Sequence, residues 1–295
     1  MPKCFGALEA GGTKMVLSVL SETGEMLERV SIPTQAPDVT MPAMIGFFAE
    51  RRIDALGIGC FGPLDLNPAS PSFGSITATP KLAWRDYPVL RAFADALQVP
   101  VKLDTDVNGA ALAEARLGAA RGLGSCLYVT VGTGIGGGLT IGGRPVHGLT
   151  HPELGHQLLT PDPRDPSPDG FCPYHKHCLE GLAAGPAIEK RWGVSGRELP
   201  PEHIAWDIEA GYLAQMCHNA IMSFSPEKII LGGGVMQQAG LFPMIREKTV
   251  ALLNGYVGSP AVDAGLEDYI VPPGLGVNSG VMGAWLLAQE ALEEA

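Results

Sequence analysis

CFGALEAGGTKMVLSVL, residues 4–20, joins two short apolar stretches through a glycine-rich turn. Cys4–Leu8 and Met15–Leu20 have the length and composition of buried strands, and Glu9–Lys14 lies between them. Two strands joined by a glycine turn predict a β-hairpin, whereas a βαβ unit would continue from the turn into a helix. The chain therefore opens on a hairpin whose turn leaves its backbone N–H groups open to a ligand.

The hairpin pattern recurs in the second half of the chain. The apolar run Ser125–Val131 ends in Gly132–Gly138 (GTGIGGG), and a second strand follows. The other predicted elements are the strands Ala55–Cys60, Val101–Leu103 and Lys228–Leu231, and the helices Met41–Arg52, Tyr87–Leu97, Gly109–Leu117, Gly185–Trp192, Trp206–Ser223 and Ser279–Glu294. This order predicts an α/β protein of two domains. Residues 1–117, completed by a C-terminal helix at 280–295, form the first domain, and residues 118–279 form the second.

Length and composition restrict the class of protein. A chain of 295 residues with 46% apolar residues suits two medium domains. The net charge is −11 with no basic patch, so we expect no nucleic-acid partner. No signal peptide and no apolar run of membrane-spanning length is visible, and six dispersed cysteines do not form a disulfide scaffold. We expect a cytoplasmic protein with no membrane segment.

Four metal-binding residue types are concentrated in one stretch of the second domain. His156, Cys172, His175 and Cys178 follow the spacing H-x15-C-x2-H-x2-C. Two thiolates and two imidazoles are a ligand set for tetrahedral zinc with no open position. The sequence therefore predicts a structural zinc site that fixes a loop flanked by Glu153 and Glu180.

The glycine turns are candidate phosphate-binding sites. Backbone N–H groups approach an anion most easily where glycine lacks a Cβ atom, and threonine hydroxyls add donors. Neither turn matches the P-loop spacing, and the G-x-G-x-x-G at 132–137 precedes a strand instead of the helix of a dinucleotide-binding motif. Ordinary hairpin turns are the alternative, but two matching turns and a third glycine cluster after a strand favour nucleotide binding. The candidate residues are Gly11, Gly12, Thr13, Lys14, Gly132, Thr133, Gly134, Gly233 and Gly234.

These motifs together resemble a known family. EAGGTK at 9–14, DTDVNGAA at 104–111, VGTGIGGG at 131–138, HPELGH at 151–156, the Cys-His-Cys loop and ILGGGV at 230–235 resemble the ROK family of repressors, open reading frames and kinases. The motif at 104–111 and the loop CPYHKHCLEG at 172–181 are most similar to its bacterial fructokinase branch. The resemblance implies the two-domain, actin-like ATPase fold, with an interdomain cleft and a zinc-stapled loop.

The resemblance also implies an activity. It implies ATP-dependent phosphorylation of D-fructose to fructose 6-phosphate, with Asp106 as general base and Glu153, His156, Glu180 and Asp106 around the sugar. ATP, Mg²⁺ and Zn²⁺ are the expected cofactors, and a homodimer is the expected assembly. Glu9, Thr105 and Lys81 stand where many relatives have Asp, Asn and Asn, so their effect on substrate contacts stays open.

Other activities remain as alternatives. The same family contains glucokinases, mannokinases, N-acetylmannosamine kinases and sugar-sensing repressors, and a non-catalytic sugar-binding protein is a further possibility. A repressor would need a DNA-binding segment before the first glycine turn, and only five residues precede Gly6. Asp104 and Asn108 are expected as helix caps or structural hydrogen-bonding groups. His147, His151, His203 and His218 are expected as surface or satisfied core histidines.

Overall fold

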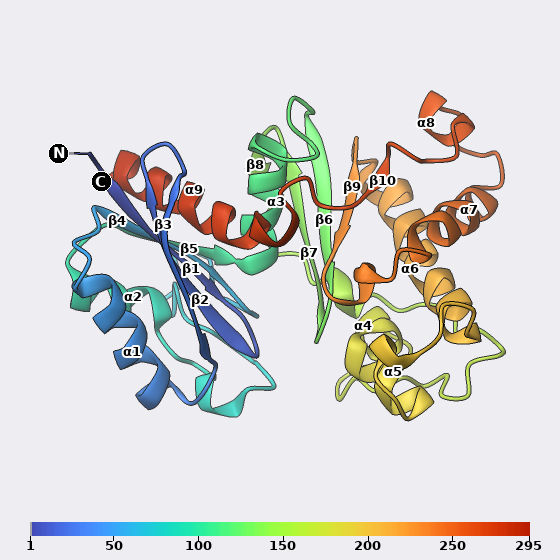
Figure 1. The fold of residues 1–295 in the computed structure, drawn as a ribbon, viewed down its shortest axis with the longest axis horizontal. Coiled ribbons are helices and arrows are strands. Elements are labelled where there is room, and N and C mark those ends of the chain that lie inside the picture. The colour runs from blue at the N-terminus through green and yellow to red at the C-terminus, as the bar shows by residue number, and fades with distance from the viewer. Residues whose placement is uncertain (1) are drawn as a thin grey trace.

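Two five-stranded sheets form the centres of two lobes in the computed structural model, which describes residues 2–295 (Figure 1). The first sheet has the order β3-β2-β1-β4-β5, in which β1 pairs antiparallel with β2 and parallel with β4. The second has the order β10-β9-β6-β7-β8, in which β6 pairs antiparallel with β7 and parallel with β9. The strands are β1 (Cys4–Ala10), β2 (Lys14–Ser21), β3 (Met26–Pro33), β4 (Ala55–Cys60), β5 (Val101–Thr105), β6 (Ser125–Val131), β7 (Ile135–Ile141), β8 (Arg144–Pro145), β9 (Ile229–Gly232) and β10 (Ile270–Val271).

Helices cover both faces of each sheet. They are α1 (Pro37–Ala49), α2 (Val89–Leu97), α3 (Asp106–Arg116), α4 (Leu179–Ala183), α5 (Gly185–Trp192), α6 (Ile204–Phe224), α7 (Leu241–Leu253), α8 (Pro260–Asp263) and α9 (Ser279–Glu294). Side chains alternate along β1: Leu8 packs with Phe48 of α1, whereas Phe5 and Ala7 pack with Ala284 of α9. The last helix of the chain thus returns to the first sheet, as Figure 1 shows in red beside blue.

Helix α3 lies between the two sheets. Leu112 and Ala113 belong to the core with α9, whereas Val107, Ala110 and Ala111 pack against β6. All residues from 107 to 114 are buried, and small side chains permit this close packing. A Cβ atom on either Gly109 or Gly283 would approach the other helix, and one on Gly283 would overlap the Gly109 backbone. Asp106 is therefore fixed at the junction of the lobes.

The α/β class and both glycine hairpins are confirmed, and β4, β6, α5 and α9 have the predicted bounds. The predicted start of α3 is wrong: the helix begins at Asp106, not Gly109, because the Thr105 hydroxyl caps it by accepting from the Asn108 N–H. Asp104 and Asn108 are consequently not the caps. Strand β3 and helix α7 were not predicted, and β3 has too few buried side chains to give an apolar pattern.

Candidate active site and metal centre

Asp106 is the first residue of α3 and follows β5 directly, so its carboxyl group faces the space between the lobes. The Val107 N–H donates to its Oδ1 at 2.9 Å. Burial raises the pKa of Asp106 to about 7, the charge of Glu9 raises it further, backbone hydrogen bonds oppose this rise, and the charge of Glu153 makes the smallest contribution. A carboxylate with a pKa near neutrality can accept a proton from an alcohol that is about to react.

Asp104 organises the residues beside the helix start. Its Oδ1 accepts from the Thr105 N–H and the Asn108 Nδ2, both at 2.7 Å, and His147 Nε2 lies 3.0 Å from its Oδ2. The hydrogen bond with Asp104 raises the pKa of His147. Asp104 and Asn108 are therefore structural hydrogen-bonding groups, which was one of the two predicted roles.

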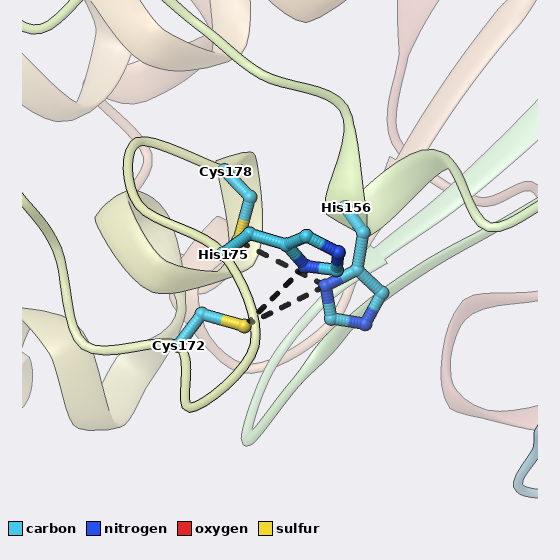
Figure 2. A group of neighbouring side chains, drawn as sticks. All are labelled: His156, Cys172, His175 and Cys178. Carbon is cyan, nitrogen blue, oxygen red and sulfur yellow. Dashed lines mark hydrogen bonds between the residues drawn. The ribbon is translucent and has the colours of Figure 1, made fainter. Parts of the chain in front are cut away.

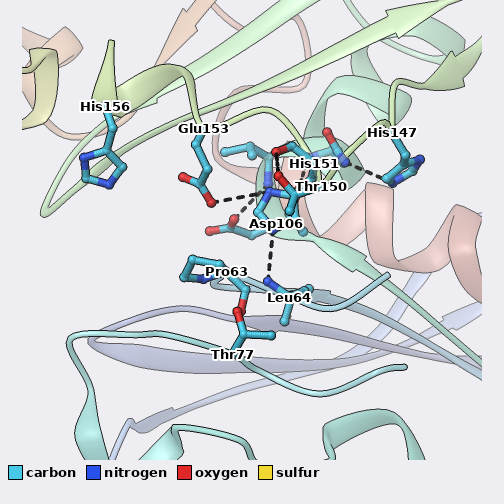
Figure 3. Close-up of polar contacts among 12 residues, drawn as sticks. Pro63, Leu64, Thr77, Asp106, His147, Thr150, His151, Glu153 and His156 are labelled. Carbon is cyan, nitrogen blue, oxygen red and sulfur yellow. Dashed lines mark hydrogen bonds and ion pairs between the residues drawn. The ribbon is translucent and has the colours of Figure 1, made fainter. Parts of the chain in front are cut away.

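Glu153 lies next to Asp106 in the cleft (Figure 3). It precedes the short turn η2 (Leu154–His156), and its side chain is 40% exposed. Burial and the charge of Glu180 raise the pKa of Glu153 to about 7. The side chain can offer hydrogen bonds to a polyhydroxylated ligand that touches Asp106.

The four predicted metal ligands converge (Figure 2). Their donor atoms all lie within 4.8 Å of one another, and His156 Nδ1 is 3.8 Å from the sulfur atoms of both Cys172 and Cys178. Cys172 Sγ is also 3.8 Å from His175 Nδ1. Tetrahedral zinc, with bonds of about 2.0–2.3 Å, separates its ligand atoms by roughly 3.3–3.8 Å. The side chains therefore fit a zinc ion in type, and three of their pairs reach this range while the whole set lies within 4.8 Å.

Glu180 connects the metal cluster with the second glycine turn. It lies in α4, two residues after Cys178, and its Oε2 accepts from the Ile135 N–H at 2.9 Å. Its Oε1 is 4.0 Å from His156 Nε2, the ring nitrogen that faces away from the cysteines. This separation is too long for a hydrogen bond, so Glu180 lies near the outer nitrogen of His156 without holding the ring. Part of Glu180 is thus engaged by the protein, while 30% of its side chain stays exposed to solvent.

A cleft of about 740 Å³ lies in the second lobe beside the second glycine turn, with Lys14 as its one lining residue from the first lobe; Asp106, Glu153 and Glu180 do not line it. Of the nine predicted nucleotide-binding residues it is lined by Lys14, Gly132, Thr133 and Gly234, while Gly11, Gly12, Thr13, Gly134 and Gly233 are their chain neighbours. The start of α5 also lines it, and the Gly185 N–H donates to the Gly132 carbonyl at 2.8 Å. The Gly185 and Ala187 N–H groups are thus engaged and Pro186 has none, so the second glycine turn, and not the start of α5, is the part of this cleft that suits phosphate groups.

Several lining residues were not predicted from the sequence. They are Gly185, Pro186, Ile188, Glu189, Ser195, Gly196, Arg197, Leu199, Trp206, Val235, Gln237 and Gln238. Val235, Gln237 and Gln238 had a signal, because they follow the third glycine cluster in the chain. The others lie in α5, in α6 or in the segment between them, and no local pattern specifies how these pack.

The chain matches the ROK family over residues 5–291. It is 48% identical to the fructokinase of Pediococcus pentosaceus, covering 99% of each chain. It is 43% identical to the fructokinase of Zymomonas mobilis, covering 98% of this chain and 97% of that protein. Glucokinases match at 26 to 27%. The solved ROK hexokinase of Thermus thermophilus is 30% identical, with a TM-score of 0.77 and full coverage of both chains. Over nearly its whole length, this chain belongs to the ROK family.

Proposed function

We propose that this protein is a fructokinase, which transfers the terminal phosphoryl group of ATP to the 6-hydroxyl group of D-fructose. The observation that carries the proposal is the 43 to 48% identity to two fructokinases over nearly the full chain. Glucokinases of the family are more distant, at 26 to 27%. Asp106 supplies a base in the cleft at the start of α3, as sugar phosphorylation requires.

Each part of the cleft has a role in this reaction. Asp106 accepts the proton of the fructose hydroxyl as its oxygen attacks the terminal phosphorus atom, and ADP leaves. Glu153, His156 and Glu180 contact the sugar hydroxyls. The turns at 9–14 and 132–138 donate backbone N–H groups to the phosphates, and Gly233 and Gly234 lie beside the adenosine. This arrangement stabilises the transferring group mainly through positioning and charge.

Two metal ions complete the proposal. Glu9 offers a carboxylate beside the first glycine turn, and its charge acts on Asp106. Mg²⁺ commonly binds to phosphates together with one or two carboxylates, so this donor set suits it. When bound, Mg²⁺ neutralises charge on the phosphates. Zn²⁺ is held by His156, Cys172, His175 and Cys178 and fixes the loop that carries Glu180.

The domain division follows the sheets. We assign residues 1–117 with α9 to one domain and residues 118–279 to the other, with the substrates between them.

The protein is expected to act as a homodimer in the cytoplasm. Within the described residues, no helix is long and apolar enough to span a bilayer.

A panel of hexoses tests the activity. The purified protein is assayed with ATP and Mg²⁺ on fructose, glucose, mannose and N-acetylmannosamine, and kcat/KM is compared. We expect the highest kcat/KM for fructose. A higher value for glucose or mannose would contradict the fructokinase assignment and leave the kinase assignment in place. Absence of phosphorylation of every hexose would contradict both.

A further inference from the structure

His151 bridges the two lobes beside Glu153 (Figure 3). It is only 5% exposed, and it belongs to the second-lobe segment between β8 and η2. Its Nε2 accepts a hydrogen bond of 3.0 Å from the N–H of Leu64, which follows β4 in the first lobe. Its Nδ1 lies 3.4 Å from Glu153 Oε1. The imidazole therefore contacts a first-lobe backbone group through one nitrogen and a cleft carboxylate through the other.

The hydrogen bond to Leu64 decides which nitrogen of His151 carries the proton. A backbone N–H can only donate, so Nε2 must be the acceptor and the proton of the neutral ring must be on Nδ1. Burial, the largest influence, lowers the pKa of His151, which favours the neutral ring. Nδ1–H is then the donor available to Glu153 Oε1, 3.4 Å away, and it shares this role with a hydrogen bond to the Pro152 backbone, which raises the pKa of His151.

The first-lobe segment that holds His151 is itself fixed. The Pro63 carbonyl accepts from both the N–H and the hydroxyl of Thr77, at 2.8 and 3.1 Å. Leu64 forms an isolated antiparallel bridge with Ile76. A Cβ atom on Gly62 would lie 3.2 Å from His151 Cε1, so the glycine leaves just enough room for the ring. Leu64 is thus a rigid anchor for the imidazole.

We propose that His151 is a positioning residue that holds the Glu153 carboxylate in the sugar site through an anchor on the opposite lobe. The inference rests on the proposed function, because it takes Glu153 to contact the sugar. A carboxylate held by an N–H donor loses less side-chain freedom when the sugar binds. Because Glu153 binds sugar and not nucleotide, loss of His151 weakens the binding of fructose and leaves that of ATP unchanged.

Three substitutions separate the two contacts of the ring. In His151→Asn, the side-chain amide lies near the position of Nδ1, so a donor to Glu153 remains and the bond to Leu64 is lost. In His151→Gln, the longer side chain reaches the position of Nε2, so an acceptor for Leu64 remains and the donor to Glu153 is lost. His151→Leu removes both contacts. His218→Asn, on α6, is the control for loss of a half-buried histidine.

The test measures KM for fructose and for ATP, kcat and thermal stability in each variant. We expect His151→Leu to raise the fructose KM about tenfold or more, while the ATP KM changes less than about twofold. His151→Asn should recover most of the fructose affinity and His151→Gln should recover little. In a Glu153→Gln background, His151→Leu should have no further effect on the fructose KM, because His151 acts through Glu153.

Two results would overturn the inference. One is an unchanged fructose KM in the Leu and Gln variants, with only thermal stability lowered, which indicates a purely structural histidine. The other is full additivity of His151→Leu and Glu153→Gln. If the panel identifies another hexose as the substrate, the same variants are assayed with that hexose. The assignment of fructose then fails independently of the role of His151, whereas inactivity on every hexose overturns both.

Discussion

At the scale of single residues, the proposed reaction depends on Asp106 as its general base. Asp106→Asn keeps the shape of the side chain and removes its basicity. We expect kcat to fall by about a hundredfold or more, the usual contribution of a general base. Sugar and nucleotide affinities, measured by calorimetry, should stay close to those of the unaltered protein. If turnover survives within a factor of a few, Asp106 is not the base.

The raised pKa of Asp106 predicts a specific pH dependence. Burial, with the charges of Glu9 and Glu153, sets this pKa at about 7, and the base acts only when it is deprotonated. Below pH 7, kcat/KM for fructose should therefore fall about tenfold per pH unit, and above pH 8 it should be constant. The pKa of Glu153 is also about 7, so Glu153→Gln is the control: it should retain the acidic limb, shifted to slightly lower pH because the charge of Glu153 contributes to the raised pKa of Asp106. A fall of kcat/KM centred near pH 4 instead would show that the pKa of the base is not raised.

At the scale of elements, the second glycine turn offers a matched pair of substitutions. A Cβ atom on Gly132 meets only the Gly134 carbonyl oxygen at 3.9 Å, and Gly132 lines the cleft. Gly132→Val should therefore preserve the fold and raise the ATP KM by about tenfold or more. A tenfold change corresponds to a loss of about 1.4 kcal/mol of binding free energy.

A Cβ atom on Gly134 would lie 2.7 Å from Glu180 Oε2. Gly134→Val should consequently displace Glu180 and raise the fructose KM as well.

Nucleotide affinity unchanged in Gly132→Val would exclude this turn from the phosphate site. A Gly134→Val variant that affects ATP alone would show that Glu180 tolerates the side chain and does not position the sugar.

The metal loop can be tested by removing both thiolates. Protein purified without chelator should contain about one zinc per chain. Cys172→Ser combined with Cys178→Ser should abolish zinc binding and lower the thermal midpoint, because structural zinc contributes folding free energy. Cys217→Ser, a buried cysteine in α6 outside the cluster, is the control and should keep the metal. Zinc retained in the double variant would contradict the ligand assignment.

The sequence predicted those elements whose physical cause is local. The hairpin at 4–20 follows from two apolar strands and glycines in the turn, and the convergence of the four candidate metal ligands follows from their spacing. The role of α5 could not be predicted, because Gly185 meets Gly132 only after the second lobe has packed. His151 likewise has no local signal, since its partner Leu64 is 87 residues away in the chain. Tertiary contacts of this kind determine the remaining part of the site.

At the scale of the whole molecule, Glu114 connects the segments by which the chain passes between the lobes. Its side chain is fully buried near the end of α3. Oε2 accepts from the N–H groups of Ala119 at 2.7 Å and Gly274 at 2.9 Å, while Oε1 accepts from the Leu275 N–H at 3.0 Å and the Ser279 hydroxyl at 2.7 Å. Ala119 lies between α3 and β6, and the other three residues lie between β10 and the start of α9. One carboxylate therefore joins both segments by which the chain passes from one lobe to the other.

Glu114→Gln is the variant that tests this connection. The carboxamide nitrogen would face two donors and accept from neither, so buried N–H groups would be left without a partner. We expect the free energy of unfolding to fall by about 2–4 kcal/mol, measured by urea denaturation. Glu293→Gln, on the exposed end of α9, is the matched control and should change it by less than about 0.5 kcal/mol. Equal stabilities of the two variants would show that these segments are held together by packing, with Glu114 adding little.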